Sequence, residues 1–289
     1  MPRRNLRGRP RLVALSVAGL DSGGGAGVET DLKVYALHGL HGTAVVTAIT
    51  AQDSRRVHAV HVVPAAMVSA QLTAVLGDFD VRVIKTGMLA TATAVNALLL
   101  ALARRPAIPL VVDPVLIASS GARLLSLAGV ARLRDRLVPR ATLVTPNLAE
   151  AAALTGEGVR TPSDMARAAR ALVAMGAGAA LVKGGHLQGQ PVDILWDGTH
   201  LSEFRHPRLS SQHTHGTGSV LAAAIASHLA LGHPLAEAVA SGIRFVTAAI
   251  ASAQALGRGR GAVDPIAAAE RLRSGDPLRR PGSRRRQAL

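Results

Sequence analysis

Cysteine is absent from the 289 residues of the chain. Disulfide bonds, thiolate metal sites and a cysteine nucleophile are therefore excluded. The absence of disulfides agrees with a reducing compartment, so we expect a cytoplasmic protein. Aromatic residues are also scarce, at 2%, although 48% of the residues are hydrophobic. A large core is possible at this length, but Val, Leu, Ile and Ala have to build it.

Long apolar runs are missing as well. No stretch reaches the roughly 18 apolar residues of a membrane helix, so we expect no membrane partner. Residues 12–20 follow an arginine-rich start and imitate a signal peptide, but they end in Asp-Ser-Gly-Gly-Gly without a small-x-small cleavage pattern. A first buried strand is the better interpretation.

Acidic residues are few: 18 Asp and Glu stand against 33 Lys and Arg, for a formal net charge of +15. Residues 1–11 hold +5 of this charge and residues 276–289 hold +4, which leaves +6 for the rest. Because both ends are rich in Arg, Pro and Gly, we interpret them as disordered. Such tails attract polyanions in general, and we expect no specific nucleic-acid partner.

Strand-like and helix-like patterns alternate along the rest of the chain. The expected strands are 12–18, 43–50, 81–85, 110–113, 141–144 and 179–183, and a hairpin is expected around Asp197-Gly198. The expected helices are 28–38, 64–77, 91–104, 162–175, 217–231 and 234–256. This alternation is typical of an α/β fold with a mainly parallel sheet covered on both faces.

No domain boundary interrupts this pattern. We therefore expect a basic disordered tail at 1–11, a single domain at 12–265, and a basic, largely disordered tail at 266–289. Polar residues or glycines recur where the expected strands end, at the edge where open α/β sheets bind ligands. These positions are Asp21, Gln52, Met88, Asp113, Asn147 and Gly184.

Two glycine-rich segments have the pattern of ligand-binding loops. The segment from Thr214 to Ser219 (THGTGS) enters a helix, where two glycines let consecutive backbone N–H groups point at a phosphate. The segment from Gly19 to Gly27 has five glycines in nine residues between a strand and a helix. An ordinary helix-entry turn and a flexible surface turn are the respective alternatives.

Seven motifs follow one another in order along the chain. They are Gly19-x-Asp-Ser-Gly-Gly-Gly-Ala-Gly-x-x-x-Asp-Leu-Lys33, Thr47-Ala-x-x-Ala-Gln52, Lys85-Thr-Gly-Met-Leu89, Asp113-Pro-Val115, Thr145-Pro-Asn-x-x-Glu150, Val182-Lys-Gly-Gly-His186 and Thr214-His-Gly-Thr-Gly218. Together they resemble the hydroxymethylpyrimidine/phosphomethylpyrimidine kinases of thiamine biosynthesis, in the ribokinase-like superfamily. The resemblance covers about residues 12–265.

The resemblance implies a ribokinase-like three-layer α/β/α sandwich. It implies ATP-dependent phosphorylation of hydroxymethylpyrimidine phosphate, and of hydroxymethylpyrimidine, with Mg²⁺ as cofactor and a homodimer as the assembly. Asp31 and Gln52 would then hydrogen-bond the aminopyrimidine, and the pocket would be lined by Gly19, Ala26, Met88 and Val115. From the residues alone, Asp31 could equally be a helix-stabilising acid, and Met88 and Val115 could be plain core.

The resemblance also assigns the phosphate end of the site. Asn147, Lys183 and Thr214 would bind ATP phosphates, while Glu150 and Asp113 would support Mg²⁺. The catalytic segment would be Gly216, Thr217, Gly218 and Ser219. A capping Asn147 with a helix-stabilising Glu150 is the alternative for that pair. We expect His186 and His215 to be structural or hydrogen-bonding residues rather than metal ligands.

Ser219 departs from the family pattern, which has a cysteine there as the general base for the acceptor alcohol. A serine hydroxyl is a far weaker acid than a thiol, so the first phosphorylation is in doubt while the fold is not. Two other hypotheses remain open: a pyridoxal-type kinase on the same fold, and a non-catalytic pyrimidine sensor that lost its base. An RNA-associated protein is a weaker alternative because it leaves the motifs unexplained.

Overall fold

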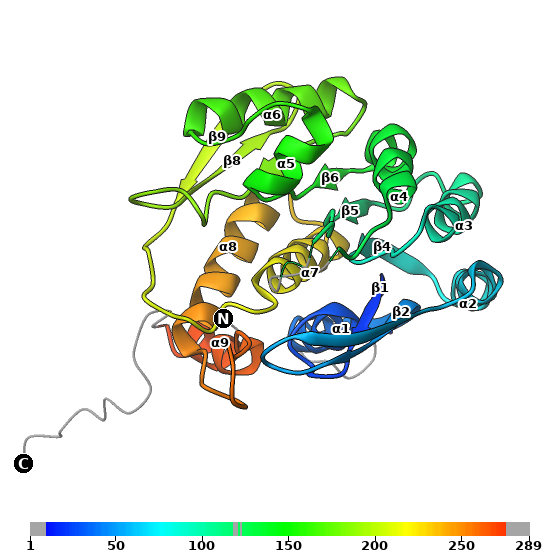
Figure 1. Ribbon diagram of the computed structural model, residues 1–289, viewed down its shortest axis with the longest axis horizontal. Helices are drawn as coiled ribbons and strands as arrows, with labels where there is room; N and C mark the ends of the chain where they lie inside the picture. Colours follow the sequence, from blue (N-terminus) through cyan, green and yellow to red (C-terminus); the bar gives the residue numbers. More distant parts are fainter. Residues whose placement is uncertain (1–9, 118–120, 122, 276–289) are drawn as a thin grey trace, which may run out of the picture.

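A nine-stranded sheet forms the centre of the part of the chain that the structure describes (Figure 1). The structure is a computed structural model and describes residues 10–117, 121 and 123–275. The strand order is β3-β2-β1-β4-β5-β6-β7-β8-β9. The strands are β1 (Val13–Asp21), β2 (His41–Gln52), β3 (Val57–Val62), β4 (Val81–Thr86), β5 (Leu110–Val112), β6 (Leu143–Val144), β7 (Ala180–Val182), β8 (Val192–Trp196) and β9 (Leu201–Arg205).

The pairing is mainly parallel, as predicted. The six strands from β2 through β1, β4, β5 and β6 to β7 run parallel, whereas β3 pairs antiparallel with β2 at one edge and β8 and β9 form an antiparallel pair at the other. The predicted hairpin is the β8–β9 connection, residues 197–200. All six strands expected from the sequence are present.

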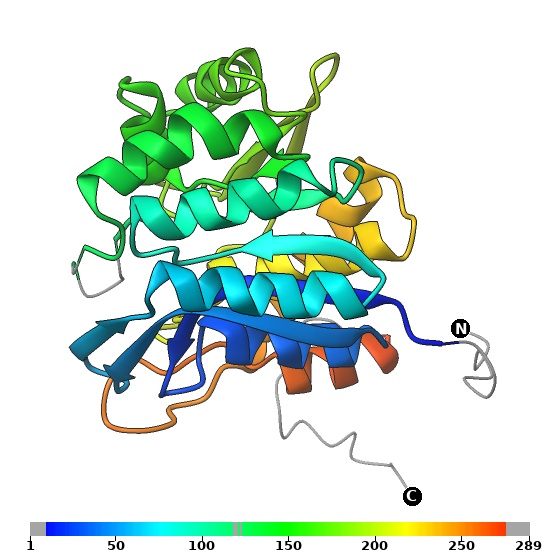
Figure 2. The same cartoon turned by 90° about the vertical axis from the view of Figure 1, so that its right-hand side faces the viewer.

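Helices cover both faces of the sheet and complete the three-layer sandwich (Figures 1 and 2). One layer holds α1 (Gly27–Leu37), α7 (Thr217–Ala230), α8 (Leu235–Ser252) and α9 (Pro265–Arg273). The other holds α2 (Ala65–Asp78), α3 (Ala92–Ala103), α4 (Leu127–Arg132), α5 (Leu148–Thr155) and α6 (Pro162–Ala174). The predicted three-layer α/β/α sandwich is confirmed.

The side-chain alternation of the strands divides the core between the two layers. Leu15 and Val17 of β1 belong to the apolar cluster under α2–α6, whereas Ala14 belongs to the cluster under α1 and α7–α9. Both faces of β1 are thus buried, which explains its nearly continuous apolar sequence. Because helices cover both faces of the sheet, ligands can reach the sheet only at its edges, such as the one formed by the carboxyl ends of the strands.

Small residues bring α7 and α8 close together. A Cβ at Gly242 of α8 would lie 2.6 Å from Cγ1 of Ile225 in α7, so glycine is needed at this crossing. Among the described residues, α8 is the one helix that is long and apolar enough to cross a bilayer, judged by length and composition alone. Half of that window is buried inside the body, as is common for a core helix.

The folded body extends beyond the predicted boundary at residue 265. Helix α9 begins at Pro265, and the Asp264 side chain accepts hydrogen bonds from the backbone N–H groups of Ile266 and Ala267 at 3.0 Å. Ala268 of α9 is fully buried. The prediction of a disordered tail is therefore wrong for 266–273, because a small apolar face of alanines packs on α8. The remaining tail predictions, for 1–9 and 276–289, lie outside the described residues.

Removing α9 should destabilise the protein. We expect a chain ending at Asp264 to melt about 5–10 °C below a chain ending at Gly275, because the loss of a packed apolar face is worth on the order of 2–3 kcal/mol. Differential scanning calorimetry of both truncated chains and the full-length protein measures this difference. Equal melting temperatures for the two truncated chains would show that α9 adds nothing to the fold.

Candidate active site

A cavity of about 980 Å³ opens along the carboxyl ends of the parallel strands. Every residue predicted for the site lines it, with the exception of Asp31. The lining residues among them are Gly19, Ala26, Gln52, Met88, Asp113, Val115, Asn147, Glu150, Lys183, Thr214, Gly216, Thr217, Gly218 and Ser219. Segments almost 200 residues apart therefore meet at one edge of the sheet, as the positions of the strand ends predicted.

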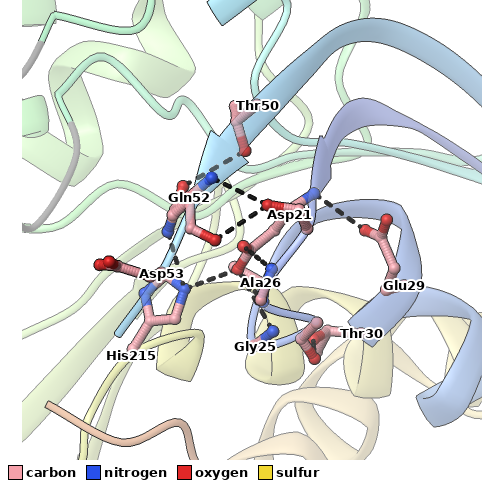
Figure 3. Close-up of polar contacts among 12 residues, drawn as sticks. Asp21, Gly25, Ala26, Glu29, Thr30, Thr50, Gln52, Asp53 and His215 are labelled. Carbon is pink, nitrogen blue, oxygen red and sulfur yellow. Dashed lines mark hydrogen bonds and ion pairs between the residues drawn. The ribbon is translucent and has the colours of Figure 1, made fainter. Parts of the chain in front are cut away.

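The carboxylate of Asp21, at the end of β1, organises the glycine-rich loop (Figure 3). It accepts hydrogen bonds from the backbone N–H groups of Gly23 at 2.8 Å, Gly25 at 3.2 Å and Ala26 at 3.0 Å. Burial raises the pKa of Asp21, but hydrogen bonds from the His215 ring and from the loop N–H groups outweigh burial and lower it. Asp21 is therefore an ionised carboxylate that holds the loop in one conformation.

His215 connects this loop to the entrance of α7. Its Nε2 lies 2.7 Å from Oδ2 of Asp21 and 3.2 Å from Nε2 of the Gln52 carboxamide. Dashed lines mark both contacts in Figure 3. Because a carboxylate only accepts, the Nε2–H donates to Asp21. The prediction that His215 is a hydrogen-bonding residue is confirmed by this bond, and Gln52 lies beside a ring nitrogen whose hydrogen is already donated to Asp21.

Close backbone contact makes the glycine at the start of α7 indispensable. Gly216 is the N-cap residue of α7 and has a φ of 82°. A Cβ there would collide with the carbonyl oxygen of Gly25, and a Cβ at Gly25 would lie 2.5 Å from the His215 ring. The glycine loop and the α7 entrance are thus packed backbone to backbone.

One end of the cavity has an apolar wall. Met88, Ala48 and Ala90 form a small cluster against which Val115 and Leu124 pack. A Cβ at Gly19 would lie 3.0 Å from the sulfur of Met88, so glycine leaves room for the thioether. A flat ring can lie on this wall while Gln52 meets its polar edge. We call this end the pyrimidine lobe, after the ring that the family resemblance implies.

Asp31 does not reach the cavity, so its predicted contact with the pyrimidine is wrong. Its side chain is fully buried, with both oxygens 2.9 Å from Nζ of Lys85 and one of them 2.5 Å from Oγ of Ser16. Burial raises the pKa of Asp31, and the Lys85 charge opposes this rise without cancelling it. Asp31 and Lys85 instead form a buried pair between α1 and β4.

Lys183 lies at the other end of the cavity, between two carboxylates. Its Nζ is 2.9 Å from Asp113 Oδ1 and 3.9 Å from Glu150 Oε2. Burial lowers the pKa of Lys183, but the charges of Asp113 and Glu150 outweigh burial and raise it. A Cβ at Gly218 would lie 3.4 Å from both Lys183 Nζ and Asp113 Oδ2, so the first turn of α7 directly adjoins this cluster. We call this end the phosphate lobe.

Asn147 and Glu150 form a capping box at the start of α5. The Asn147 side chain accepts from the Glu150 N–H at 2.9 Å, and the Glu150 carboxylate accepts from the Asn147 N–H at 2.8 Å. The capping alternative is therefore confirmed, and both side chains also line the cavity. Burial raises the pKa of Glu150 to about 7; Lys183 opposes this rise and Asp113 adds to it.

Ser219 lies in the first turn of α7 and lines the cavity with 9% of its surface exposed. Thr217, two residues earlier, donates its hydroxyl to the carbonyl oxygen of Thr214 at 2.7 Å. The N–H groups of such a first turn have no partner within the helix, and the helix dipole adds positive charge. The N–H of Thr217 donates to the carbonyl oxygen of Thr214 at 3.3 Å, and the anion site expected for this segment stays a prediction.

Arg208, in the connection between β9 and α7, was not predicted. Its guanidinium donates to the carbonyl oxygens of Gly189 at 2.8 Å, Gly185 at 3.4 Å and Leu187. The loop after Lys183 is thereby held against the phosphate lobe. One arginine in an arginine-rich chain carries no local signal, so only the fold could identify it.

Comparisons with known proteins agree with this geometry. The family profile described as phosphomethylpyrimidine kinase matches residues 21–264. The thiamine biosynthesis bifunctional protein ThiED of Geobacter sulfurreducens is 49% identical over 91% of this chain, which spans 54% of that longer protein. The hydroxymethylpyrimidine/phosphomethylpyrimidine kinase of Rhizobium meliloti is 48% identical, over 87% of this chain and 96% of its own length.

Solved structures show the same relationship. An ADP complex of Bacillus subtilis pyridoxal kinase superposes with a TM-score of 0.84 at 32% identity, over 89% of this chain and 98% of that one. The phosphomethylpyrimidine kinase of Clostridium difficile superposes with a TM-score of 0.75 at 35% identity, over 83% of this chain and 100% of that one.

The fold and its structural neighbours define a ribokinase-like kinase, with a glycine-rich segment at a helix start and a small apolar wall in the same cavity. Within this class, the chain belongs to the phosphomethylpyrimidine kinase family. Its relatives are named kinases, and ADP is bound in a structural neighbour, so the chain is a phosphotransferase that uses ATP.

Glu150 should make the stability of the metal-free protein depend on pH. Its pKa is about 7 in the folded protein against an ordinary 4.5, so folding takes up a proton between these values. Stability should therefore be highest below about pH 4.5 and fall by roughly 2–3 kcal/mol as the pH rises to about 7, at 1.36 kcal/mol per pKa unit.

Urea unfolding at pH 5 and pH 7 in EDTA measures this effect. Glu150→Gln keeps an acceptor for the capping box and should reduce the pH dependence, whereas Glu270→Gln on the exposed side of α9 should leave it unchanged. If Glu150→Gln unfolds with the pH dependence of the wild type, Glu150 titrates normally.

Proposed function

We propose that this protein transfers the γ-phosphate of ATP to hydroxymethylpyrimidine phosphate and, more slowly, to hydroxymethylpyrimidine. The observation that carries the proposal is a single cavity with an apolar lobe beside Gln52 and an anion site beside Lys183. The names of the relatives support this choice of acceptor.

In the proposed reaction an acceptor oxygen forms a bond to the γ-phosphorus while the bond to the β–γ bridging oxygen breaks and ADP leaves. The transition state carries its charge on the equatorial oxygens, so catalysis is mainly positioning and charge stabilisation. The N–H groups at the start of α7 and the Lys183 ammonium supply this stabilisation. Gln52 and the Met88 wall orient the ring.

The two acceptors make different demands on Ser219. An alcohol loses its proton during or after the transfer, and a positioned base contributes about 10²–10⁴-fold to such a step. A phosphomonoester has a second pKa near 6, so its oxygen is already negatively charged near neutral pH. The monophosphate therefore needs the anion site and cations but no base.

The residues of the phosphate lobe fit a Mg²⁺ ion carried in with ATP. Asp113 and Glu150 are two buried carboxyl groups beside one lysine, and they offer oxygen donors of the kind that Mg²⁺ prefers. Within the described residues no group of three or more His, Asp or Glu side chains could hold a metal alone, so nucleotide phosphates would complete the shell. The ion would neutralise charge on the transferred phosphate.

A pyridoxal-type kinase is the second candidate, because pyridoxal kinases superpose with TM-scores up to 0.84. Pyridoxal offers no aminopyrimidine edge to Gln52. Steady-state turnover of pyridoxal compared with hydroxymethylpyrimidine separates the two candidates. A non-catalytic sensor would bind the pyrimidine without consuming ATP.

The homodimer and the cytoplasmic location are further proposals. The first rests on the family resemblance, and the second rests on the absence of cysteine. Light scattering after size-exclusion chromatography would measure the assembly, and fractionation of cells would measure the location.

Lys183→Ala should lower kcat/KM for ATP at least about tenfold, because a charge-assisted contact to phosphate is lost. The measurement is steady-state kinetics with a saturating acceptor, with the melting temperature as the check on folding. Kinetics equal to wild type would make Lys183 a purely structural partner of Asp113.

Ser219→Cys should raise kcat/KM for the alcohol acceptor selectively, by about tenfold or more, and leave the monophosphate nearly unchanged. Wild type should correspondingly prefer the monophosphate. Coupled ADP-release assays on both acceptors give the four values needed. Similar wild-type values on alcohol and monophosphate would contradict the proposed role, since a loose transition state would then need no base.

A further inference from the structure

A buried carboxylate adjoins the loop that follows Lys183, and no step of the proposed reaction involves it. Asp193 lies in β8, is 5% exposed and lines the cavity. Its neighbours in the strand, Val192 and Ile194, are apolar and each 1% exposed. A carboxylate in such surroundings costs stability unless hydrogen bonds or charges compensate it. Asp193 therefore has to serve a purpose that an apolar side chain could not serve.

The Asp193 side chain holds the residue that directly follows Lys183. Gly184 donates its N–H to Oδ1 of Asp193 at 2.8 Å, and this contact is buried. Gly184 also packs closely on β8, because a Cβ there would collide with the carbonyl oxygen of Val192. The backbone after Lys183 is thus fixed to β8 by one carboxylate and by close backbone contact.

Asp193 also belongs to the charges around Lys183. The antiparallel pairing of β7 with β8, continued by one residue, places Lys183 opposite Asp193. Burial lowers the pKa of Lys183, and the charges of Asp113 and Glu150 are the main causes that raise it. The charge of Asp193 raises this pKa as well, but it is the weakest of these effects. The hydrogen bond to Gly184 is therefore the stronger link between Asp193 and the phosphate lobe.

A second segment closes over the same loop. His206 donates its backbone N–H to the carbonyl oxygen of Pro191 at 3.2 Å, and its ring Nε2 lies 3.4 Å from Oδ2 of Asp193. Within the described residues, this buried ring nitrogen has no hydrogen-bond partner. Arg208 donates to three carbonyl oxygens of the loop. The loop is thus held at its start by Asp193 and along its length by Arg208.

The loop held in this way carries part of the cavity wall. Lys183, Gly185 and His186 line the cavity, and the Lys183 ammonium lies in the phosphate lobe. A charged group that stabilises a transferred phosphate has to stay within about 0.5 Å of its productive position. Because Gly184 directly follows Lys183 in the chain, a displaced Gly184 also displaces this ammonium.

We propose that Asp193 is a positioning residue for ATP, which holds the Gly184 N–H and thereby places the Lys183 ammonium against the nucleotide phosphates. This inference rests on the proposed function, in which Lys183 stabilises the transferred phosphate. Asp193 acts through Gly184 and Lys183 and not on the reacting atoms themselves. The pyrimidine lobe lies at the other end of the cavity, so acceptor binding should not depend on Asp193.

Two substitutions separate the hydrogen bond of Asp193 from its charge. Asp193→Asn keeps an oxygen that accepts from the Gly184 N–H but loses the charge, whereas Asp193→Glu keeps the charge and moves the carboxylate by one methylene. We expect kcat/KM for ATP to change less than about threefold in the Asn variant and to fall at least about tenfold in the Glu variant, because a displaced Lys183 loses a charge-assisted contact. KM for the acceptor should change less than about twofold in both.

The opposite pattern, with the Asn variant impaired and the Glu variant active, would make charge the cause and overturn the inference. Equal losses in both variants, or wild-type kinetics in the Glu variant, would overturn it as well. Melting temperatures check the folding of each variant. If the Glu variant does not fold, Asp193→Ser takes its place, since serine is uncharged like asparagine but too short to reach Gly184; the same tenfold loss is expected.

Asp197 gives a matched control in the turn at the other end of β8. Its Oδ1 accepts from the backbone N–H groups of Thr199 at 2.9 Å and His200 at 2.6 Å, and its side chain does not line the cavity. Asp197→Asn and Asp197→Glu should leave kcat/KM for ATP unchanged. A tenfold loss in Asp197→Glu would show that any disturbance of the β8–β9 hairpin impairs ATP use, and Asp193 would then have no particular role.

A failure of the proposed function would be visible separately. If wild type phosphorylates neither hydroxymethylpyrimidine nor its monophosphate, the choice of acceptor is wrong, and isothermal titration with ADP then tests Asp193 directly. Asp193→Glu should bind ADP at least about fivefold more weakly than wild type, and Asp193→Asn should bind it about as tightly. Equal ADP affinities of wild type and the Glu variant would refute the positioning role.

Discussion

The carboxylate of Asp21 is the contact on which the geometry of the site depends. It is 5% exposed and holds three backbone N–H groups of the glycine loop and the ring of His215. His215 precedes the α7 entrance and touches Gln52. The glycine loop and the entrance of α7 are therefore parts of one hydrogen-bonded unit, and a buried donor left without a partner would disturb both.

The phosphate lobe shows a second constraint, a charge imbalance. Two carboxylates, Asp113 and Glu150, share the single ammonium of Lys183, and burial leaves one of them, Glu150, with a pKa of about 7. The start of α7 adds positive potential beside them. Neither positive nor negative charge dominates in the phosphate lobe. Such a site suits a ligand that brings several negative charges together with a divalent cation.

Much of the fold and site could be predicted because the signals are local. Strand–helix alternation predicts the parallel sheet, and strand ends then place distant residues such as Gln52 and Lys183 at one edge. Asp31 shows the limit of this reasoning. Whether a carboxylate near a glycine loop faces the cavity depends on how α1 packs, and its partner Lys85 lies 54 positions away. Helix α9 was missed because its buried residues are Pro265, Ala268, Ala269 and Arg271, which give little hydrophobic contrast in the sequence.

Ser219 bears on one of the two proposed acceptors and not on the other. A hydroxyl in place of a thiol weakens proton removal, which only the alcohol requires. The monophosphate attacks through an oxygen that already carries negative charge near neutral pH, so on the proposed function it needs cations and the start of α7 but no base. The position that departs from the family pattern therefore acts on the choice of acceptor through the chemical step, while the fold and the cavity serve both acceptors alike.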